Sequence, residues 1–226
     1  MNNRKIFSIL TYSLIPLIVS SIWLIFYYAP TEKVLGFSQK IFYFHVPLAW
    51  NGLMAFIIVF GASVAYLRTK NKKHDIVARA AAEVGVIFTS LVLITGPIWA
   101  KPAWGSWWNW DVRLTTTLIL WLLYVGYLML GNSVEEEGKR SRFLAVYGVV
   151  AFVDVPLVFF SIRLWNSIHP AIVDSEGMHL DGQMKVAFFL SLFAFTVLFA
   201  SILWVRVKLG KAQEELEKLK EGANAG

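Results

Sequence analysis

The sequence predicts an all-α membrane protein with six transmembrane helices. Of the 226 residues, 57% are hydrophobic and only 16% are charged, and the mean hydropathy is +0.58. A soluble domain of this length carries about 25% charged residues, so the composition is that of a membrane protein. Six apolar stretches are each long enough to cross a hydrocarbon core, which takes roughly 20 helical residues. Basic residues gather in alternate connections between these stretches, as expected for a multi-pass protein with a fixed orientation.

The predicted spans follow one another without an internal repeat or a low-complexity tract. They cover residues 6–28, 41–67, 80–100, 114–131, 143–162 and 186–205. The first span follows Arg4 and Lys5, as a signal peptide would. Its apolar run exceeds the ~7–15 residues of a signal h-region, however, and no small-x-small cleavage site follows Tyr28. We therefore expect a retained helix, within a single six-helix transmembrane domain of residues 1–207.

The distribution of lysine and arginine predicts the orientation. Of 21 such residues, 15 lie in the N-terminal arm, the second-to-third and fourth-to-fifth connections and the C-terminal segment, and six lie in the other three loops. The positive-inside rule then places both termini in the cytoplasm and a short tryptophan-rich interfacial segment outside. Residues 208–226 form a polar cytoplasmic tail whose Glu–Lys pairs at helical spacing indicate a helix. We favour a solvated extension over a partner-docking role for this tail.

Composition also excludes several functional classes. The net charge of +6 lies in short loops and not on a soluble basic face, so a nucleic-acid partner is not expected. The chain has no cysteine, which removes disulfides, thiol nucleophiles, iron–sulfur clusters and covalent haem attachment through C-x-x-C-H. No nucleophile–base pair or metal-hydrolase pattern occurs, so ordinary enzymatic catalysis is not expected.

One segment holds an excess of aromatic surface. Five of the ten tryptophans fall between Trp99 and Trp110, in a connection between two apolar spans. An ordinary interfacial belt needs only scattered tryptophan and tyrosine. An interfacial helix lying flat, with Asp111 as N-cap of the fourth span, is one explanation. It accounts for Asp111 but not for the adjacent indoles, which indicate a platform for a flat apolar ligand.

The four histidines separate by predicted side. His74 lies in a basic cytoplasmic loop and is expected to be a solvated surface residue. His45, His169 and His179 lie on the tryptophan side, in different parts of the chain. An imidazole at the mouth of an apolar helix is costly unless it is paired, ligating or facing a cavity. A ligand role and a structural role are about equally expected for His45 alone, and the loop setting of His169 alone favours a structural role.

Taken together, two imidazoles, a cluster of indoles and nearby cations match the requirements of a haem. Haem needs one or two axial donors, commonly neutral imidazole, and a broad apolar surface. A quinone would use the aromatic surface but not two axial imidazoles, and hydrated divalent ions would need more carboxylates than this side offers. The tryptophans could supply the surface, and propionates could pair with basic side chains from Lys101, Arg113, Arg163 and Lys185.

Two acids lie within predicted spans. Glu83 is near the cytoplasmic end of the third span, and Asp154 lies deeper and should be paired or face protein or water. A structural hydrogen bond is the favoured role for Asp154. The prolines at 97, 102 and 156 predict breaks or kinks near helix ends.

The run Trp104-Gly105-Ser106-Trp107-Trp108-Asn109-Trp110-Asp111-Val112-Arg113-Leu114-Thr115 resembles the tryptophan-rich "WWD" signature of haem-handling proteins. Within that family, the six spans, the element His45-Val46-Pro47 and the later Trp165-Asn166 with His169 are similar to cytochrome c maturation protein C, the CcmC family. The resemblance covers nearly the whole chain, and its signature is long and specific.

The resemblance implies a haem-binding inner-membrane protein of cytochrome c biogenesis. CcmC-like proteins work with the ABC transporter subunits CcmA and CcmB and the small membrane protein CcmD, and present haem on the periplasmic face to the haem chaperone CcmE. By this resemblance, His45 and His169 are the axial ligands of a non-covalent haem b. The cofactor-binding candidates are Trp104, Trp107, Trp108, Trp110, Asp111 and Arg113.

Two other functions remain open at this stage. A haem exporter that moves haem through the bundle would need polar or ligating residues along the whole depth, and beyond Asp154 the spans offer almost none. A purely structural subunit would use its aromatic surface only to dock partners. External presentation of haem is the leading hypothesis.

Overall fold

The computed structural model describes residues 3–170, 173–174, 177–178 and 180–224, and it is predominantly helical. Two short segments flank the first connection: the π-helical η1 (Leu24–Tyr28) and the 3₁₀-helical η2 (Phe37–Ile41). The strands β1 (Val173–Asp174) and β2 (Gly177–Met178) pair antiparallel. The α-helices are α1 (Asn3–Trp23), α2 (Phe42–Thr69), α3 (Lys72–Trp104), α4 (Val112–Ser133), α5 (Glu137–Ala151), α6 (Asp154–Leu164) and α7 (Gly182–Asn224).

The six predicted spans are confirmed. Six helical segments in the described part of the chain are long and apolar enough to cross a membrane: Phe7–Tyr28, Phe37–Thr69, Lys72–Trp104, Val112–Ser133, Glu137–Leu164 and Gly182–Lys220. Most extend beyond the predicted limits, because apolar composition marks only the part that crosses lipid. The protein is therefore an all-α multi-pass membrane protein.

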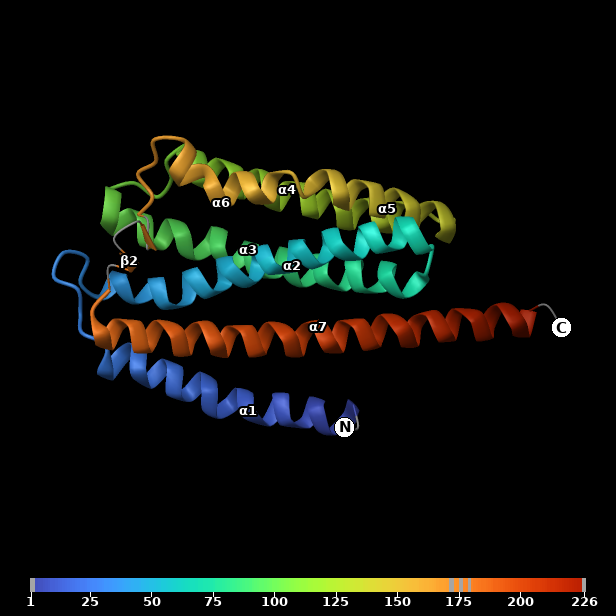
Figure 1. Ribbon diagram of the computed structural model, residues 1–226, viewed down its shortest axis with the longest axis horizontal. Coiled ribbons are helices and arrows are strands. Elements are labelled where there is room, and N and C mark those ends of the chain that lie inside the picture. The colour runs from blue at the N-terminus through green and yellow to red at the C-terminus, as the bar shows by residue number, and fades with distance from the viewer. Residues whose placement is uncertain (1–2, 171–172, 175–176, 179, 225–226) are drawn as a thin grey trace.

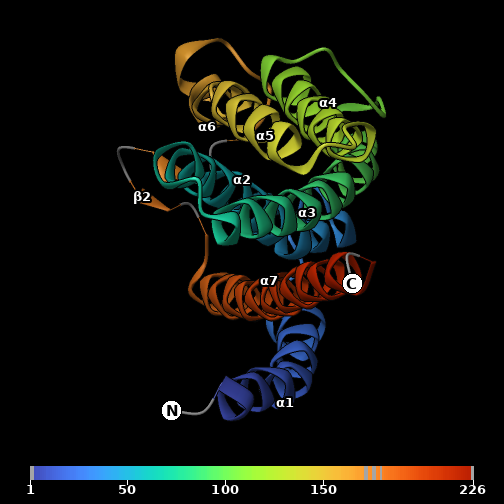
Figure 2. The same cartoon turned by 90° about the vertical axis from the view of Figure 1, so that its right-hand side faces the viewer.

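The helices are arranged in layers (Figures 1 and 2). Helices α2 and α3 lie in the middle, α4, α5 and α6 pack on one side of them, and α7 followed by α1 lies on the other side. Both termini lie at the end of the bundle that carries the α2–α3 and α4–α5 connections, called here the basic end. The loop between α3 and α4 lies at the opposite end, called here the tryptophan end.

Close packing of α2, α3 and α4 forms the core of the bundle. The ring of Phe56 on α2 stacks on Tyr124 of α4, with centroids 3.7 Å apart and an interplanar angle of 15°. A Cβ at Gly85 would lie 2.5 Å from Phe56 Cε1, so only glycine lets α3 approach α2 at that level. These contacts close the middle of the bundle beneath the tryptophan end.

The fifth span is broken, as the proline at 156 predicts. Helix α5 ends at Ala151 and α6 begins at Asp154, two residues before Pro156. Helix α3, in contrast, continues without interruption through Pro97 and Pro102. Because proline has no N–H, the carbonyls four residues earlier, those of Leu93 and Ile98, each lose one helical hydrogen bond.

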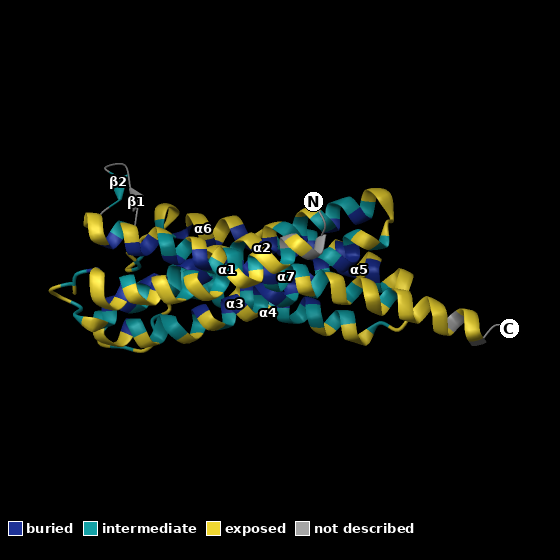
Figure 3. Ribbon diagram, turned by 90° about the horizontal axis from the view of Figure 1, so that it is seen from below, coloured by how far each residue is buried: buried dark blue, intermediate teal, exposed yellow. Residues whose placement is uncertain are grey.

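The long helix α7 continues past residue 207 as far as Asn224, and its last turns project from the bundle with mostly exposed residues (Figure 3).

At the basic end, Lys72 pairs with Asp75 at 2.8 Å, and Arg206 pairs with Glu83. The division into a domain of residues 1–207 and a tail of residues 208–226, and the cytoplasmic position of both termini, stay predictions.

Candidate functional site

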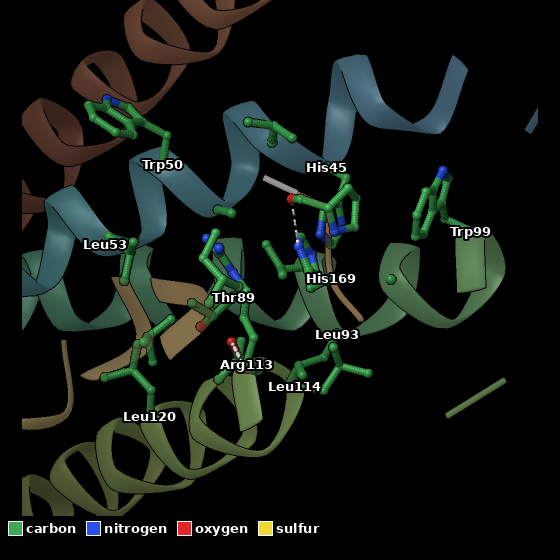
Figure 4. A pocket seen from close by; sticks show the side chains of 18 of the residues that line it. His45, Trp50, Leu53, Thr89, Leu93, Trp99, Arg113, Leu114, Leu120 and His169 are labelled. Atoms are coloured by element: carbon green, nitrogen blue, oxygen red, sulfur yellow. Dashed lines mark hydrogen bonds between the residues drawn. The ribbon is translucent and has the colours of Figure 1, made fainter. Parts of the chain in front are cut away.

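A cavity of about 300 Å³ opens at the tryptophan end, between the middle layer and the layer of α4 and α6 (Figure 4). Its walls are mainly apolar, and it reaches from the loops of the tryptophan end inward to Leu53, Leu120 and Val158. The side chains with aromatic, imidazole or cationic groups that line it are Phe42, His45, Trp50, Trp99, Trp104, Trp108, Arg113, Phe159, Arg163 and His169. The structure thus brings His45, His169 and part of the tryptophan segment to one site.

His45 is held in a defined tautomer by the neighbouring helix. Its Nδ1 lies 2.9 Å from Thr95 Oγ1 on α3. The Thr95 hydroxyl donates its own proton to the carbonyl of Leu91 at 2.8 Å, so its oxygen must accept from His45 Nδ1–H. This leaves Nε2 with a free lone pair, the state in which an imidazole binds iron.

Close approach of α3 also fixes the ring of His45. A Cβ at Gly96 would lie 3.4 Å from His45 Cε1, which is tighter than most real contacts. Thr95 and Gly96 therefore act together, one by hydrogen bonding and the other by leaving room. The sequence assigns neither residue to a site, although Gly96 directly precedes Pro97, where it predicts a break.

His169 has the same tautomer on a different element. It lies in the loop after α6, and its Nδ1 is 3.2 Å from the carbonyl oxygen of Pro170, which can only accept. Nδ1 therefore carries the proton, and Nε2 is again free. Trp104 packs edge-on against this imidazole, with centroids 6.4 Å apart and planes at 64°.

Burial, followed by the positive charge of Arg113 and by His45, lowers the pKa of His169 to about 4. His169 is consequently neutral at physiological pH. A neutral imidazole is the form that ligates a metal, so no proton has to be displaced on binding.

Asp111 joins the His169 loop to the start of α4. Its Oδ1 accepts from the backbone N–H of Arg113 at 2.9 Å, which makes it the N-cap of α4, as the sequence predicts. The same carboxylate accepts from Ser167 Oγ at 2.9 Å and from the N–H of Ile168 at 3.0 Å. Ser167 Oγ in turn accepts from the N–H of His169 at 3.1 Å. Asp111 does not line the cavity; it positions the residues that do.

The tryptophans of the segment divide into two groups. Trp104 and Trp108 line the cavity, whereas Trp107 and Trp110 are 59% and 76% exposed and do not. Residues 105–111 form an irregular loop, so the segment is not a helix lying flat. Trp50 and Trp99 also line the cavity, and Trp99 packs edge-on against Trp104 at 5.2 Å between centroids.

Of the four cations considered from the sequence, Arg113 and Arg163 line the cavity. Lys101 instead donates to the carbonyl of Gly105 at 2.9 Å, and Lys185 is not among the lining residues. His74 lies at the start of α3, at the basic end. His179 lies outside the described residues.

The chain matches the family model described as "Heme exporter protein C" (CcmC) over residues 2–221. The chain belongs to the CcmC family. A protein of Bradyrhizobium diazoefficiens named "Heme exporter protein C" is 36% identical over 77% of this chain and 67% of its own length. The protein of that name from Escherichia coli K12 is 33% identical over 87% of this chain and 79% of its own. A Marchantia polymorpha protein named "Putative cytochrome c biosynthesis ccmC-like mitochondrial protein" is 32% identical over 75% of this chain and 72% of its own.

This family match agrees with the resemblance of the tryptophan segment to the WWD signature. The matched residues include all the spans that line the cavity. The CcmC match extends from α1 into the projecting part of α7, so it includes all the helices of the bundle.

Proposed function

We propose that this protein handles haem in cytochrome c biogenesis, holding a non-covalent haem b in the cavity at the tryptophan end and presenting it on the external face of a bacterial inner membrane. One observation carries the proposal. Two histidines from separate segments line one apolar cavity, and in each Nδ1 makes a hydrogen bond while Nε2 makes none within the described part of the chain. This donor set fits a haem iron with two axial imidazoles.

The rest of the cavity fits the remaining parts of the ligand. Trp104 and Trp108 offer flat apolar surface to a porphyrin, and Arg113 and Arg163 offer charge-assisted hydrogen bonds to its propionates. Iron bound at this site supplies the ligand-exchange chemistry on which capture and release depend. Asp111 contributes by holding the His169 loop in place.

Trp107 and Trp110 face outward beside the cavity, where the haem acceptor would dock. Aromatic side chains exposed on a loop are typical of partner-binding surfaces. We assign this surface to the haem chaperone CcmE. The ABC transporter subunits CcmA and CcmB and the small protein CcmD are the other expected partners, and the basic end is expected to face the cytoplasm.

Transport of haem through the centre of the bundle is less well supported. Below Leu53, Leu120 and Val158, the stacked rings of Phe56 and Tyr124 fill the bundle at a spacing of 3.7 Å. A porphyrin could pass only if this packing opened. Haem flux measured in liposomes containing this protein alone should therefore stay at the level of empty liposomes.

Haem titration of the purified haem-free protein tests the ligand assignment. We expect His45→Ala and His169→Ala each to weaken haem binding and alter the Soret band, and the double variant to lose both axial ligands. His74→Ala is the matched control, because His74 lies at the basic end. An unchanged Soret spectrum in the double variant would contradict the assignment.

The two tryptophan groups provide a second test. Replacing Trp104 and Trp108 by leucine should weaken haem binding, because these indoles line the cavity. Replacing Trp107 and Trp110 by leucine should leave haem binding unchanged and reduce haem transfer to CcmE. Equal effects of both pairs on transfer, with haem binding retained, would favour a structural docking role for the whole segment.

A further inference from the structure

The break in the fifth span places a polar cluster in the interior of the membrane domain. Where α5 and α6 meet, the N–H of Val153 bonds the carbonyl of Val150 at 3.2 Å and the N–H of Val155 bonds that of Phe152 at 3.0 Å, which are single turns and not a continuous α-helix. Pro156 has no N–H and cannot continue the pattern. Interrupted backbone at membrane depth is tolerated where it is buried in protein or lines a hydrated space.

Four buried side-chain atoms around this break have no hydrogen-bond partner in the described part of the chain. They are Asp154 Oδ2, the hydroxyls of Tyr124 and Tyr127, and Ser63 Oγ. Both tyrosines and Ser63 are 0% exposed, and Asp154 is 8% exposed. Leaving such groups without partners is unfavourable, because each has lost its hydrogen bonds to water. Several in one place indicate bound water, since buried polar groups in proteins are nearly always satisfied.

The four residues lie close together although they come from three helices. The rings of Tyr124 and Tyr127 are 6.2 Å apart, and Asp154 interacts electrostatically with Tyr124. Ser63 and Tyr127 converge on Gly148, where an added Cβ would lie 2.7 Å from Ser63 Oγ and 3.4 Å from Tyr127 Cε2. The small residue at 148 thus brings α5 against these polar groups.

The charged surroundings of Asp154 differ from those of the other buried aspartate. Asp75 bonds both Lys72 at 2.8 Å and Ser141 at 2.9 Å. Asp154 makes no ion pair within the described part of the chain, and the titratable hydroxyls of the cluster are those of Tyr124 and Tyr127 on α4 and of Tyr147 on α5. The charged groups that act on Tyr127 lie on α3 and belong to Asp75, Arg79 and Glu83. A carboxylate with no cation is unfavourable at membrane depth, and protonation removes that cost.

The cluster lies directly beneath the cavity. Tyr124 is four residues, about one helical turn, from Leu120 on α4, and Asp154 is one turn from Val158 on α6. Leu120 and Val158 both line the cavity. A single layer of apolar side chains therefore separates the cluster from the cavity.

We propose that the α5–α6 break is a hydrated proton-binding site. Water occupies the space between Asp154, Tyr124, Tyr127 and Ser63, and the Asp154 carboxylate accepts a proton from hydronium, which leaves as water. The reverse transfer returns the proton to water. The proposal does not depend on what the cavity above it binds.

Infrared spectroscopy of the haem-free full-length protein, titrated with acid in H₂O and in D₂O, tests this site. We expect a carboxylic-acid C=O band that grows as pH falls, shifts in D₂O and is absent from Asp154→Asn. Asp75→Asn is the matched control and should keep the band, because Asp75 is already paired. A carboxylate that persists to the lowest pH at which the protein stays folded, or an acid band that neither titrates nor shifts in D₂O, would overturn the proposal.

Tyr124→Phe gives a second test that does not require Asp154 to be replaced. Removing the hydroxyl takes a donor from the water around the carboxylate, which disfavours the charged form and should move the titration midpoint to higher pH. An unchanged midpoint would exclude Tyr124 from the site and overturn the proposed cluster.

Discussion

The contribution of Asp111 to ligand binding can be estimated from its three hydrogen bonds. Asp111→Ala removes the N-cap of α4, which contributes about 1 kcal/mol, and two bonds that hold the His169 loop. A hydrogen bond to a charged group contributes roughly 1.5–3 kcal/mol, and partial exposure favours the lower figure. The loop therefore loses about 3 kcal/mol of anchoring.

Part of that loss should appear in haem affinity, because His169 leaves its ligating position more often. Removing a group that orients a metal ligand typically lowers affinity 10–100-fold, or about 1.4–2.7 kcal/mol, which the anchoring energy covers. We expect this decrease in haem titrations followed at the Soret band, with a shift toward five-coordinate iron. Ser167→Ala removes the bond from Ser167 to Asp111 and the bond from the His169 N–H to Ser167, but it leaves the Ile168–Asp111 bond and the N-cap of α4, so it should have a smaller effect. Wild-type affinity and a six-coordinate spectrum in Asp111→Ala would refute the reasoning.

Three further predictions concern His45, His169 and the helix packing. Thr95→Val should lower haem affinity about tenfold by freeing the tautomer of His45, and Thr95→Ser should restore it, both measured by haem titration. Because burial lowers the pKa of His169 to about 4, competition from protons should weaken haem binding only as pH falls toward that value; a decline centred near the ordinary value of 6.5 would contradict this. Gly85→Ala should destabilise the bundle by roughly 1–3 kcal/mol because its Cβ would overlap an aromatic ring of α2, and Gly138→Ala, which has open space, should leave the melting temperature unchanged.

The sequence predicts the helical architecture well because apolar length and the positions of basic residues are local properties. The six spans follow from apolar length, and the break in the fifth span follows from the position of Pro156. The N-cap at Asp111 is also local and is confirmed. Helix limits are less predictable, since tertiary packing extends α3 past Pro97 to Trp104.

The candidate site is only partly predictable, because its geometry depends on contacts between distant segments. His45 and His169 are identifiable as ligands by residue type, but the tautomer of His45 depends on Thr95, fifty residues away. The separation of Trp104 from Trp107 depends on where α3 ends, which composition does not indicate. In the sequence, Tyr124 and Tyr127 are two aromatic residues of an apolar span. Only the fold shows that they lie near Asp154.

The two proposed iron ligands are held in unequal ways, which predicts the one that yields when haem is released. His45 sits within α2 and is fixed against α3 by Thr95 and by the close approach at Gly96. His169 sits on a loop whose side-chain hydrogen bonds to α4 and the turn before it, among the described residues, come from the carboxylate of Asp111. Loosening a loop requires only a few hydrogen bonds to break, whereas moving His45 requires repacking two helices, so His169 should dissociate first.

Haem dissociation to an excess of a haem-scavenging protein measures this difference. Asp111→Asn keeps an acceptor oxygen but cannot accept both loop bonds, so it should accelerate dissociation several-fold with little change in the association rate. Thr95→Val should accelerate dissociation less, because the helix still confines His45. Faster haem dissociation from Thr95→Val than from Asp111→Asn would indicate that His45 dissociates first, which contradicts the proposed order. Since Ser167 and Ile168 bond Asp111, which directly follows the exposed Trp110, a partner that docks on Trp110 could displace His169 and so couple its own binding to haem release.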